Sequence, residues 1–267
     1  MNIWLISGCS NGLGRCWTDS VIREHRDRVI GITRSAQAAH EMSEIYQEHF
    51  IPCVADVCDE QHLAQLLPKL AKEVGIPNRI VTSAGYAQFG TLEDLSTDQL
   101  RQQFATNVEG TLNVIKPLLP LMRQLEEARI LLVSSMSGVA CWPLLGAYQM
   151  SKHAIEAMGQ TLRLELDDTS IQVGVIQPGP YRTGWATTSA QRQVIGAAYD
   201  SEALKRRAAC GFNVKDPRAS LPFFWKMFDT PVMPAMLATS DEFIELACIQ
   251  AKEKIKLWRA SLDSTDN

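Results

Sequence analysis

The sequence predicts an α/β fold in which helices cover both faces of one doubly wound parallel sheet. Short apolar runs alternate with helical segments along most of the chain, and the first run ends in a glycine-rich turn that opens a helix. A strand, a glycine turn, a helix and a second strand within about 30 residues form a βαβ unit, which requires parallel strands. The 267 residues, of which 46% are hydrophobic, are enough for one core and hence for a single domain.

The predicted elements alternate regularly through the first two thirds of the chain. Strands are predicted over residues 3–7, 29–33, 51–55, 80–82, 130–134 and 171–176. Helices are predicted over residues 13–24, 36–48, 61–74, 98–122 and 148–167, and Pro117 and Pro120 disturb the fourth of them.

Beyond residue 184 the periodicity weakens. We expect a substrate lid over residues 184–213 and a C-terminal extension over residues 214–267, both within the single domain 1–267. Asp216-Pro217 indicates a capped helix start, whereas Pro222 argues against an undistorted helix there. A final helix is predicted over residues 243–261.

Composition narrows the possible partners. The formal net charge of −4 gives no reason to expect a nucleic acid or an anionic membrane as a partner. Seven scattered cysteines indicate free thiols in a reducing compartment, and none has the spacing of a metal site. The chain opens directly on a predicted strand, and its most apolar later stretch, 221–237, is too short and too broken by prolines to span a bilayer. We therefore expect a cytoplasmic protein without a metal.

A glycine-rich loop follows the first predicted strand and opens the first helix. Residues 8–14 read Gly-Cys-Ser-Asn-Gly-Leu-Gly. Glycines let the backbone turn tightly and approach a pyrophosphate, whose charge is stabilised at the helix N-terminus. In the first βαβ unit of a doubly wound sheet, such a loop predicts a dinucleotide site.

Three residues near the fifth predicted strand outline a proton-transfer site. Ser135 follows that strand, and Tyr148 and Lys152 share one face of the next helix, about one turn apart. A free phenol has a pKa near ~10, and a neighbouring ammonium group lowers it because it stabilises the phenolate. A surface pair on an amphipathic helix is the alternative interpretation, which the nearby serine and the glycine loop disfavour.

These motifs together resemble the short-chain dehydrogenase/reductase family, in the branch with chains of about this length. The residues that carry the resemblance follow the family's order: Ser7 before the loop, Asn107, the strand end 133–135, Tyr148, Lys152, Pro178, Gly179 and Thr183. They cover the chain to about residue 185. The resemblance implies a Rossmann fold, a nicotinamide cofactor and a homodimer or homotetramer. Residues 178–185 look like those of a poorly characterised oxidoreductase subgroup.

The resemblance assigns roles to four residues. Tyr148 exchanges a proton with the substrate oxygen, and Lys152 lowers the Tyr148 pKa and binds the nicotinamide ribose. Ser135 orients the carbonyl group, and Asn107 holds a water that links Lys152 to solvent. Hydride transfer to a carbonyl builds negative charge on its oxygen, so donors that already face this oxygen suit the reaction.

The resemblance also implies cofactor contacts at one edge of the sheet. They are Gly8, Ser10, Asn11, Gly12, Leu13, Gly14, Arg34, Asp56, Val57, Ala84, Gly85, Asn107, Tyr148, Lys152, Pro178, Gly179 and Thr183. The chain departs from the family pattern in two ways: Thr82-Ser83 replaces two asparagines, and Ser7 replaces a threonine. The shorter reach of Thr82 and Ser83 concerns the bracing of the central strands more than the chemistry.

The end of the second predicted strand favours NADP over NAD. A carboxylate there would bind the ribose hydroxyls and repel a 2′-phosphate. The chain has Thr33-Arg34-Ser35 instead, and Arg34 can pair with the phosphate. A solvated surface arginine is the alternative. Asp56 matches the family's acceptor for the adenine amine, or it caps the helix that follows.

The candidate substrate residues are aromatic apart from one serine. They follow the strand ends that face the nicotinamide: Ser135, Tyr86, Phe89, Trp142, Tyr181 and Trp185. Such a lining suits a hydrophobic alcohol or ketone.

We therefore expect an NADP-dependent oxidoreductase that interconverts a secondary alcohol and a carbonyl compound, with a small-molecule substrate as its partner. Two alternatives remain open. One is an NADP-binding regulator or scaffold without catalysis, to which the Thr82-Ser83 departure lends slight support. The other is an epimerase or dehydratase that recycles its cofactor.

Overall fold

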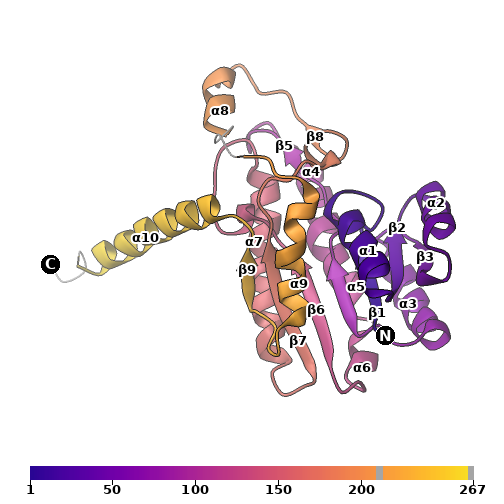
Figure 1. Ribbon diagram of the computed structural model, residues 1–267. Coiled ribbons are helices and arrows are strands. Elements are labelled where there is room, and N and C mark those ends of the chain that lie inside the picture. The colour runs from indigo at the N-terminus through magenta and orange to yellow at the C-terminus, as the bar shows by residue number, and fades with distance from the viewer. Residues whose placement is uncertain (209–212, 264–267) are drawn as a thin grey trace.

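A single parallel sheet forms the centre of the computed structural model, which describes residues 1–208 and 213–263 (Figure 1). Its strand order is β3-β2-β1-β4-β6-β7-β9, and all neighbouring strands run parallel. The strands are β1 (Ile3–Ser7), β2 (Arg28–Thr33), β3 (Phe50–Val54), β4 (Arg79–Thr82), β6 (Ala128–Val133), β7 (Ile171–Gln177) and β9 (Met236–Ala238). The order reverses between β1 and β4, so the predicted doubly wound sheet is confirmed.

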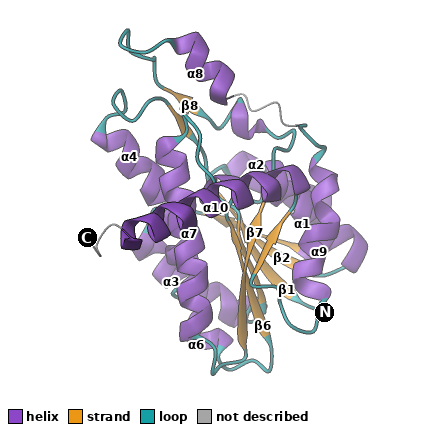
Figure 2. Ribbon diagram, turned by 90° about the vertical axis from the view of Figure 1, so that its left-hand side faces the viewer, coloured by secondary structure: helices purple, strands orange, loops and turns teal. Residues whose placement is uncertain are grey.

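Helices cover both faces of this sheet (Figure 2). One face is covered by α1 (Gly12–His25), α2 (Ala36–Tyr46) and α9 (Leu221–Asp229). The other is covered by α3 (Glu60–Val74), α5 (Gly110–Ile115) and α7 (Gly146–Glu165). In β1, Trp4 and Ile6 enter the core on the first face, and Leu5 enters the core on the second. Because both faces are buried, the strands are apolar at most positions rather than at every second one.

The predicted helix over residues 98–122 is divided in the structure. It consists of α4 (Thr97–Phe104), a π-helical turn (Ala105–Glu109), α5 and the short α6 (Leu119–Met122). Ser96 begins α4 through a capping box with Gln99. Pro120 lies in the first turn of α6, where a backbone N–H would have no acceptor within the helix, so the missing donor of proline costs nothing. The apolar pattern of the sequence did not predict the π-helical turn.

Beyond the predicted lid, the chain contains two elements that the strand and helix patterns did not predict. β9 has only three residues and is too short for a periodic signal. α9 accepts Pro222 because this residue lies in the first turn, directly after a 3-10 turn (Pro217–Ser220) that Asp216 caps. Phe224 of α9 stacks on Trp17 of α1 at a ring-centroid distance of 5.0 Å, which fixes α9 to the sheet domain.

The predicted lid lies against the loop that follows β4. β8 (Gln191–Arg192) pairs with β5 (Gln88–Phe89), and α8 (Ser201–Ala208) follows. Residues 209–212 of the predicted lid and 264–267 of the predicted extension lie outside the described residues. The extension ends in α10 (Asp241–Asp263), which projects from the domain (Figure 1). Within the described ranges, no helix is long and apolar enough to cross a bilayer.

Candidate active site

A cavity of about 1020 Å³ opens where the parallel strands end. It is lined by the following residues that the sequence singled out: Gly8, Ser10, Asn11, Gly12, Leu13, Gly14, Arg34, Asp56, Val57, Ala84, Gly85, Tyr86, Phe89, Ser135, Trp142, Tyr148, Lys152, Pro178, Gly179, Tyr181, Thr183 and Trp185. Asn107 lies just beneath its wall and is 1% exposed. The carboxyl edge of such a sheet is where ligands bind.

The glycine loop leaves room that a side chain would fill. Gly8 has φ +68°, and a Cβ there would meet Ala84 Cα at 2.8 Å. Gly12 has φ +56°, a conformation that favours glycine. Asn11 precedes α1 without a capping hydrogen bond from its side chain, so the first N–H groups of α1 are left to a ligand. This cradle fits the pyrophosphate of a dinucleotide.

The three residues that depart from the family pattern do not behave alike. Ser83 Oγ donates to Ser7 O at 2.5 Å, and Ala84 N donates to Ser7 Oγ at 3.2 Å, so these serines join β1 to the end of β4. Thr82 Oγ1 is buried and finds no partner among the described residues. Ser83 therefore takes over the bracing, and Ser7 needs only its hydroxyl.

Tyr148 and Lys152 lie on the first two turns of α7 and are both buried. The Lys152 ammonium donates to Val133 O at 2.8 Å and lies 5.7 Å from the centroid of the Tyr148 ring. Burial raises the pKa of Tyr148 to about 12, although a hydrogen bond with Ser135 lowers it. Burial lowers the pKa of Lys152 to about 8, against the attraction of Glu156. Tyr148 is therefore a neutral phenol in this structure, which suits a proton donor.

Ser135 is held by the turn that follows β6. It precedes the 3-10 turn Met136–Gly138, and its Oγ accepts a hydrogen bond from Ser137 N at 3.1 Å. With its acceptor side engaged there, the hydroxyl is oriented toward Tyr148, as the hydrogen bond between the two side chains requires. Both hydroxyls line the same cavity.

The π-helical turn brings Asn107 under the active-site wall. Its side chain accepts from Tyr86 N at 3.1 Å and donates to Tyr86 O at 3.1 Å and to Ser151 Oγ at 3.0 Å. A Cβ on Gly85 would lie 3.0 Å from Asn107 Oδ1 and 3.8 Å from Lys152 Nζ. Asn107 Oδ1 and Lys152 Nζ therefore both lie close to one point beside Gly85, and the water link between them stays a prediction.

Glu156 is a buried carboxyl group that sequence reasoning missed. It lies one turn after Lys152 on α7, is 6% exposed, and accepts from Gln177 Nε2 at 3.0 Å. Burial raises the pKa of Glu156, and the neighbouring Lys152 lowers it. Its spacing of four from Lys152 was the available signal, because acidic side chains are seldom buried without such a partner.

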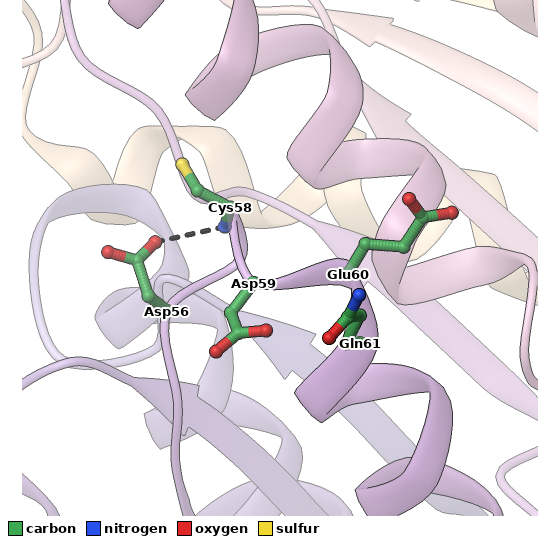
Figure 3. A pocket seen from close by; sticks show the side chains of 5 residues that line it. All are labelled: Asp56, Cys58, Asp59, Glu60 and Gln61. Atoms are coloured by element: carbon green, nitrogen blue, oxygen red, sulfur yellow. Dashed lines mark hydrogen bonds between the residues drawn. The ribbon is translucent and has the colours of Figure 1, made fainter.

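Arg34 and Asp56 lie together at the opposite end of the cavity. Their nearest charged atoms are 3.8 Å apart, and their side chains are 76% and 44% exposed. The carboxylate of Asp56 accepts from Cys58 N at 3.0 Å, whereas Asp59 caps α3 (Figure 3). The helix-capping alternative for Asp56 is therefore wrong. A shallow second pocket of about 520 Å³ adjoins this end, and its lining is Asp56, Cys58, Asp59, Glu60 and Gln61.

The aromatic candidates separate into groups. Trp185 from the lid lies over Tyr148 and Phe89, at ring-centroid distances of 5.0 and 5.9 Å. Trp142 contacts Phe243 of α10 instead, at 6.2 Å. Tyr181 lines the same cavity. Burial raises the pKa of Tyr86, and Cys58 and Arg34 also act on it, which groups Tyr86 with the Arg34 end.

Comparison with known proteins identifies the family of this chain. The family model described as short chain dehydrogenase matches residues 2–194. An uncharacterized oxidoreductase of Bacillus subtilis, YusZ, is 34% identical over 70% of this chain and 68% of its own. The NADPH-dependent 3-dehydrocapnine reductase of Ornithobacterium rhinotracheale is 31% identical over 68% of this chain and 66% of its own.

A solved structure extends the likeness to the whole fold. The short-chain dehydrogenase from Streptomyces avermitilis superposes with a TM-score of 0.90 at 24% identity, over 100% of this chain and 99% of that one. The family match covers the glycine loop and both ends of the cavity. This chain belongs to the short-chain dehydrogenase family, and it is an oxidoreductase of that family.

Proposed function

We propose that this oxidoreductase transfers a hydride between NADP(H) and a secondary alcohol or carbonyl compound, with Tyr148 as the general acid and base. One observation carries the proposal: Ser135, Tyr148 and Lys152 line the same cavity as the glycine loop. A cavity of about 1020 Å³ is large enough for a dinucleotide with a substrate beside it.

The chain's own residues handle the proton. A nicotinamide cofactor, when bound, supplies or accepts the hydride. Tyr148, held neutral by burial, donates its proton to the carbonyl oxygen as negative charge develops there, and the Ser135 hydroxyl stabilises the same oxygen. The Lys152 ammonium stabilises the phenolate that remains, and Asn107 orders the route by which a proton returns.

NADP is the proposed cofactor because the end of β2 carries a cation and two hydroxyl side chains, Thr33-Arg34-Ser35, rather than a carboxylate. Arg34 lines the cavity, and Ser35 caps α2 through Ala38 N at 3.1 Å. Arg34 is free to leave Asp56 for a phosphate because their 3.8 Å contact is exposed to water. The NADPH-dependent relative supports the same choice.

The proposed substrate is hydrophobic and uncharged. The part of the cavity beyond Tyr148 is lined by Phe89, Trp142, Leu145, Trp185 and Phe243. Arg34 and Asp56 belong to the cofactor end, and Lys152 lies beneath Tyr148, so no described charged side chain of the lining faces the substrate end. Segment 184–208 is proposed to act as the lid, because Trp185 covers Tyr148.

We also propose that the enzyme works in the cytoplasm as a homodimer or homotetramer. The described cysteines are all free thiols, which suits a reducing compartment. Family resemblance supports the oligomer.

The test uses the full chain with NADPH and a panel of hydrophobic ketones. We expect NADPH oxidation with at least one of them, and a loss of about 10³-fold in kcat for Tyr148→Phe, because general acid catalysis contributes on this scale. Tyr46→Phe, a buried phenol remote from the cavity, is the matched control and should keep its activity. Saturable NADPH binding without oxidation would favour a regulator, and product without net oxidation would favour an epimerase or dehydratase.

A further inference from the structure

The C-terminal helix leaves the body of the protein after its first turns. Phe243 is buried, and the Gln250 side chain accepts from Cys141 N at 2.9 Å and donates to Cys141 O at 3.0 Å. From Ala251 to Ser261 every residue is exposed, and Figure 1 shows this part of α10 pointing away from the sheet. Residues 251–261 of this helix therefore keep all of their apolar side chains open to a partner surface.

A narrow apolar seam runs along the arm. It consists of Ile244, Cys248, Ala251, Ile255 and Trp258. The spacing alternates between four and three residues, which is the heptad period of a coiled coil. Ile244 and Ile255 are 43% exposed and Trp258 is 59% exposed. The seam lies about 110° around the helix axis from the side that holds Phe243 and Gln250, so the body of the protein does not cover it.

We propose that this seam packs against the same seam of a second copy of the chain, antiparallel about a two-fold axis near Glu253. In this register Ala251 faces Ile255 of the partner subunit, and Cys248 faces Trp258 of the partner subunit. Each of these two layers joins a small side chain to a large one, so the two helices approach evenly between them.

A parallel pairing would give the opposite result. Trp258 would meet its own copy in one layer, and Ala251 would meet its own copy in another. The first layer would be overfilled and the second would leave a void, and both errors cost stability. The sizes of the seam residues therefore select the antiparallel pairing.

In this register, charged side chains beside the seam attract one another at the two ends of the paired helices and repel one another at the centre. Glu245 lies beside Arg259 of the partner subunit, twice by symmetry. Among the described side chains, neither residue has an ion-pair partner in its own chain. Lys252 lies near its own copy at the axis. Opposite and like pairs at a surface have small effects of similar size, so side-chain shape carries the pairing and charge tunes it.

The first experiment measures the self-association of the full chain by sedimentation equilibrium. Ile255→Asp should weaken the dimer at least ~100-fold, because it buries an unpaired carboxylate in the seam. Leu257→Asp is the matched control: Leu257 is 62% exposed on another side of α10, and its replacement should leave association unchanged. Lys252→Gln should tighten the dimer several-fold. If the chain also assembles through another surface, Ile255→Asp should halve the mass of the assembly.

A second experiment tests the register. Glu245→Arg alone and Arg259→Glu alone should each weaken α10 pairing about tenfold, because each places like charges side by side twice. An equimolar mixture of the two variants should recover the wild-type affinity, since every such pair is then of opposite sign. Failure of the mixture to recover, or an unchanged mass for Ile255→Asp, would overturn the proposal. So would sedimentation with phosphatidylglycerol vesicles that Ile255→Asp abolishes while the mass stays constant, because the seam would then face lipid.

Discussion

The two ends of the cavity differ in how far their ionisable side chains are exposed to water. Tyr148 and Lys152 are each 6% exposed, and burial moves both pKa values toward the neutral forms. Arg34 and Asp56 stand in water at 76% and 44% exposure. Water and salt screen an exposed pair but act little on a buried one. In the proposed function, the proton chemistry thus rests on a few strongly perturbed groups, whereas cofactor preference rests on weak, graded interactions.

The largest effect should follow from removing the buried cation. Lys152→Met should lower kcat about 10³-fold, because the phenolate of Tyr148 then forms without a compensating charge. Steady-state kinetics at saturating NADPH measures this. Lys69→Met, which replaces an exposed lysine on α3, is the control. A kcat within tenfold of the wild type would show that burial of Lys152 has no catalytic purpose.

Burial of Lys152 should also appear as a pH dependence of stability. A lysine whose pKa falls from 10.5 to about 8 on folding binds fewer protons in the folded state between these values. Its contribution to the free energy of unfolding therefore rises with pH, by about 2 kcal/mol between pH 8 and 10. Above pH 10 the raised pKa of Tyr148 acts in the opposite direction.

Urea unfolding of the wild type and of Lys152→Met at several pH values isolates this contribution. The difference in unfolding free energy between the two proteins should change by about 2 kcal/mol over this window. Parallel curves would mean that Lys152 keeps its ordinary pKa in the folded protein.

A somewhat smaller effect should come from the wall beneath the buried end. Asn107→Ala leaves the N–H group of Tyr86 without its partner, and Tyr86 O keeps only the hydrogen bond from Gln103 Nε2, so the change should cost about 2 kcal/mol in unfolding free energy. It should also lower kcat, because Asn107 orders the proton route. Asn113→Ala loses one buried bond, to Val57 O at 3.0 Å, and should destabilise the protein while leaving kcat intact. Equal kcat losses in both variants would assign Asn107 a structural role alone.

The smallest effect should occur at the exposed end. Arg34→Asp should lower the NADP/NAD ratio of kcat/KM about tenfold, since it replaces a phosphate-binding cation with a group that repels phosphate. The shift should shrink as ionic strength rises. Arg123→Asp, at an exposed position after α6, is the control. An unchanged ratio would exclude Arg34 from cofactor choice.

The parts of the fold that could be predicted are those whose signal is local. The alternation of apolar runs and helices predicts six strands of the sheet, because a strand buried on both faces is apolar throughout. The three residues of β9 carry no such pattern, and β8 is defined only by its pairing with Phe89 and its neighbour in β5. Tertiary packing decides these elements, and a single sequence does not contain it in readable form.

The site divides in the same way. The order of the motifs was enough to predict that Ser135, Tyr148 and Lys152 lie close together, and all three line the cavity. The direction in which the pKa of Tyr148 shifts was not predictable. The sequence suggests that Lys152 lowers this pKa, whereas burial raises it. Trp185 contributes to this burial, and it lies in the predicted lid, the segment with the weakest pattern in the chain.

The π-helical turn makes chain length at this place part of the active site. A π-turn accommodates one residue more than an α-helix would, and each residue turns the helix by about 100°. Deleting a single residue between Phe104 and Asn107 would let the segment relax to a regular α-helix. Asn107 would then swing away from Tyr86 and Ser151 although no contacting residue had been substituted. Among related chains, a gap in this helix should therefore accompany loss or change of the proton route more reliably than a substitution on its surface.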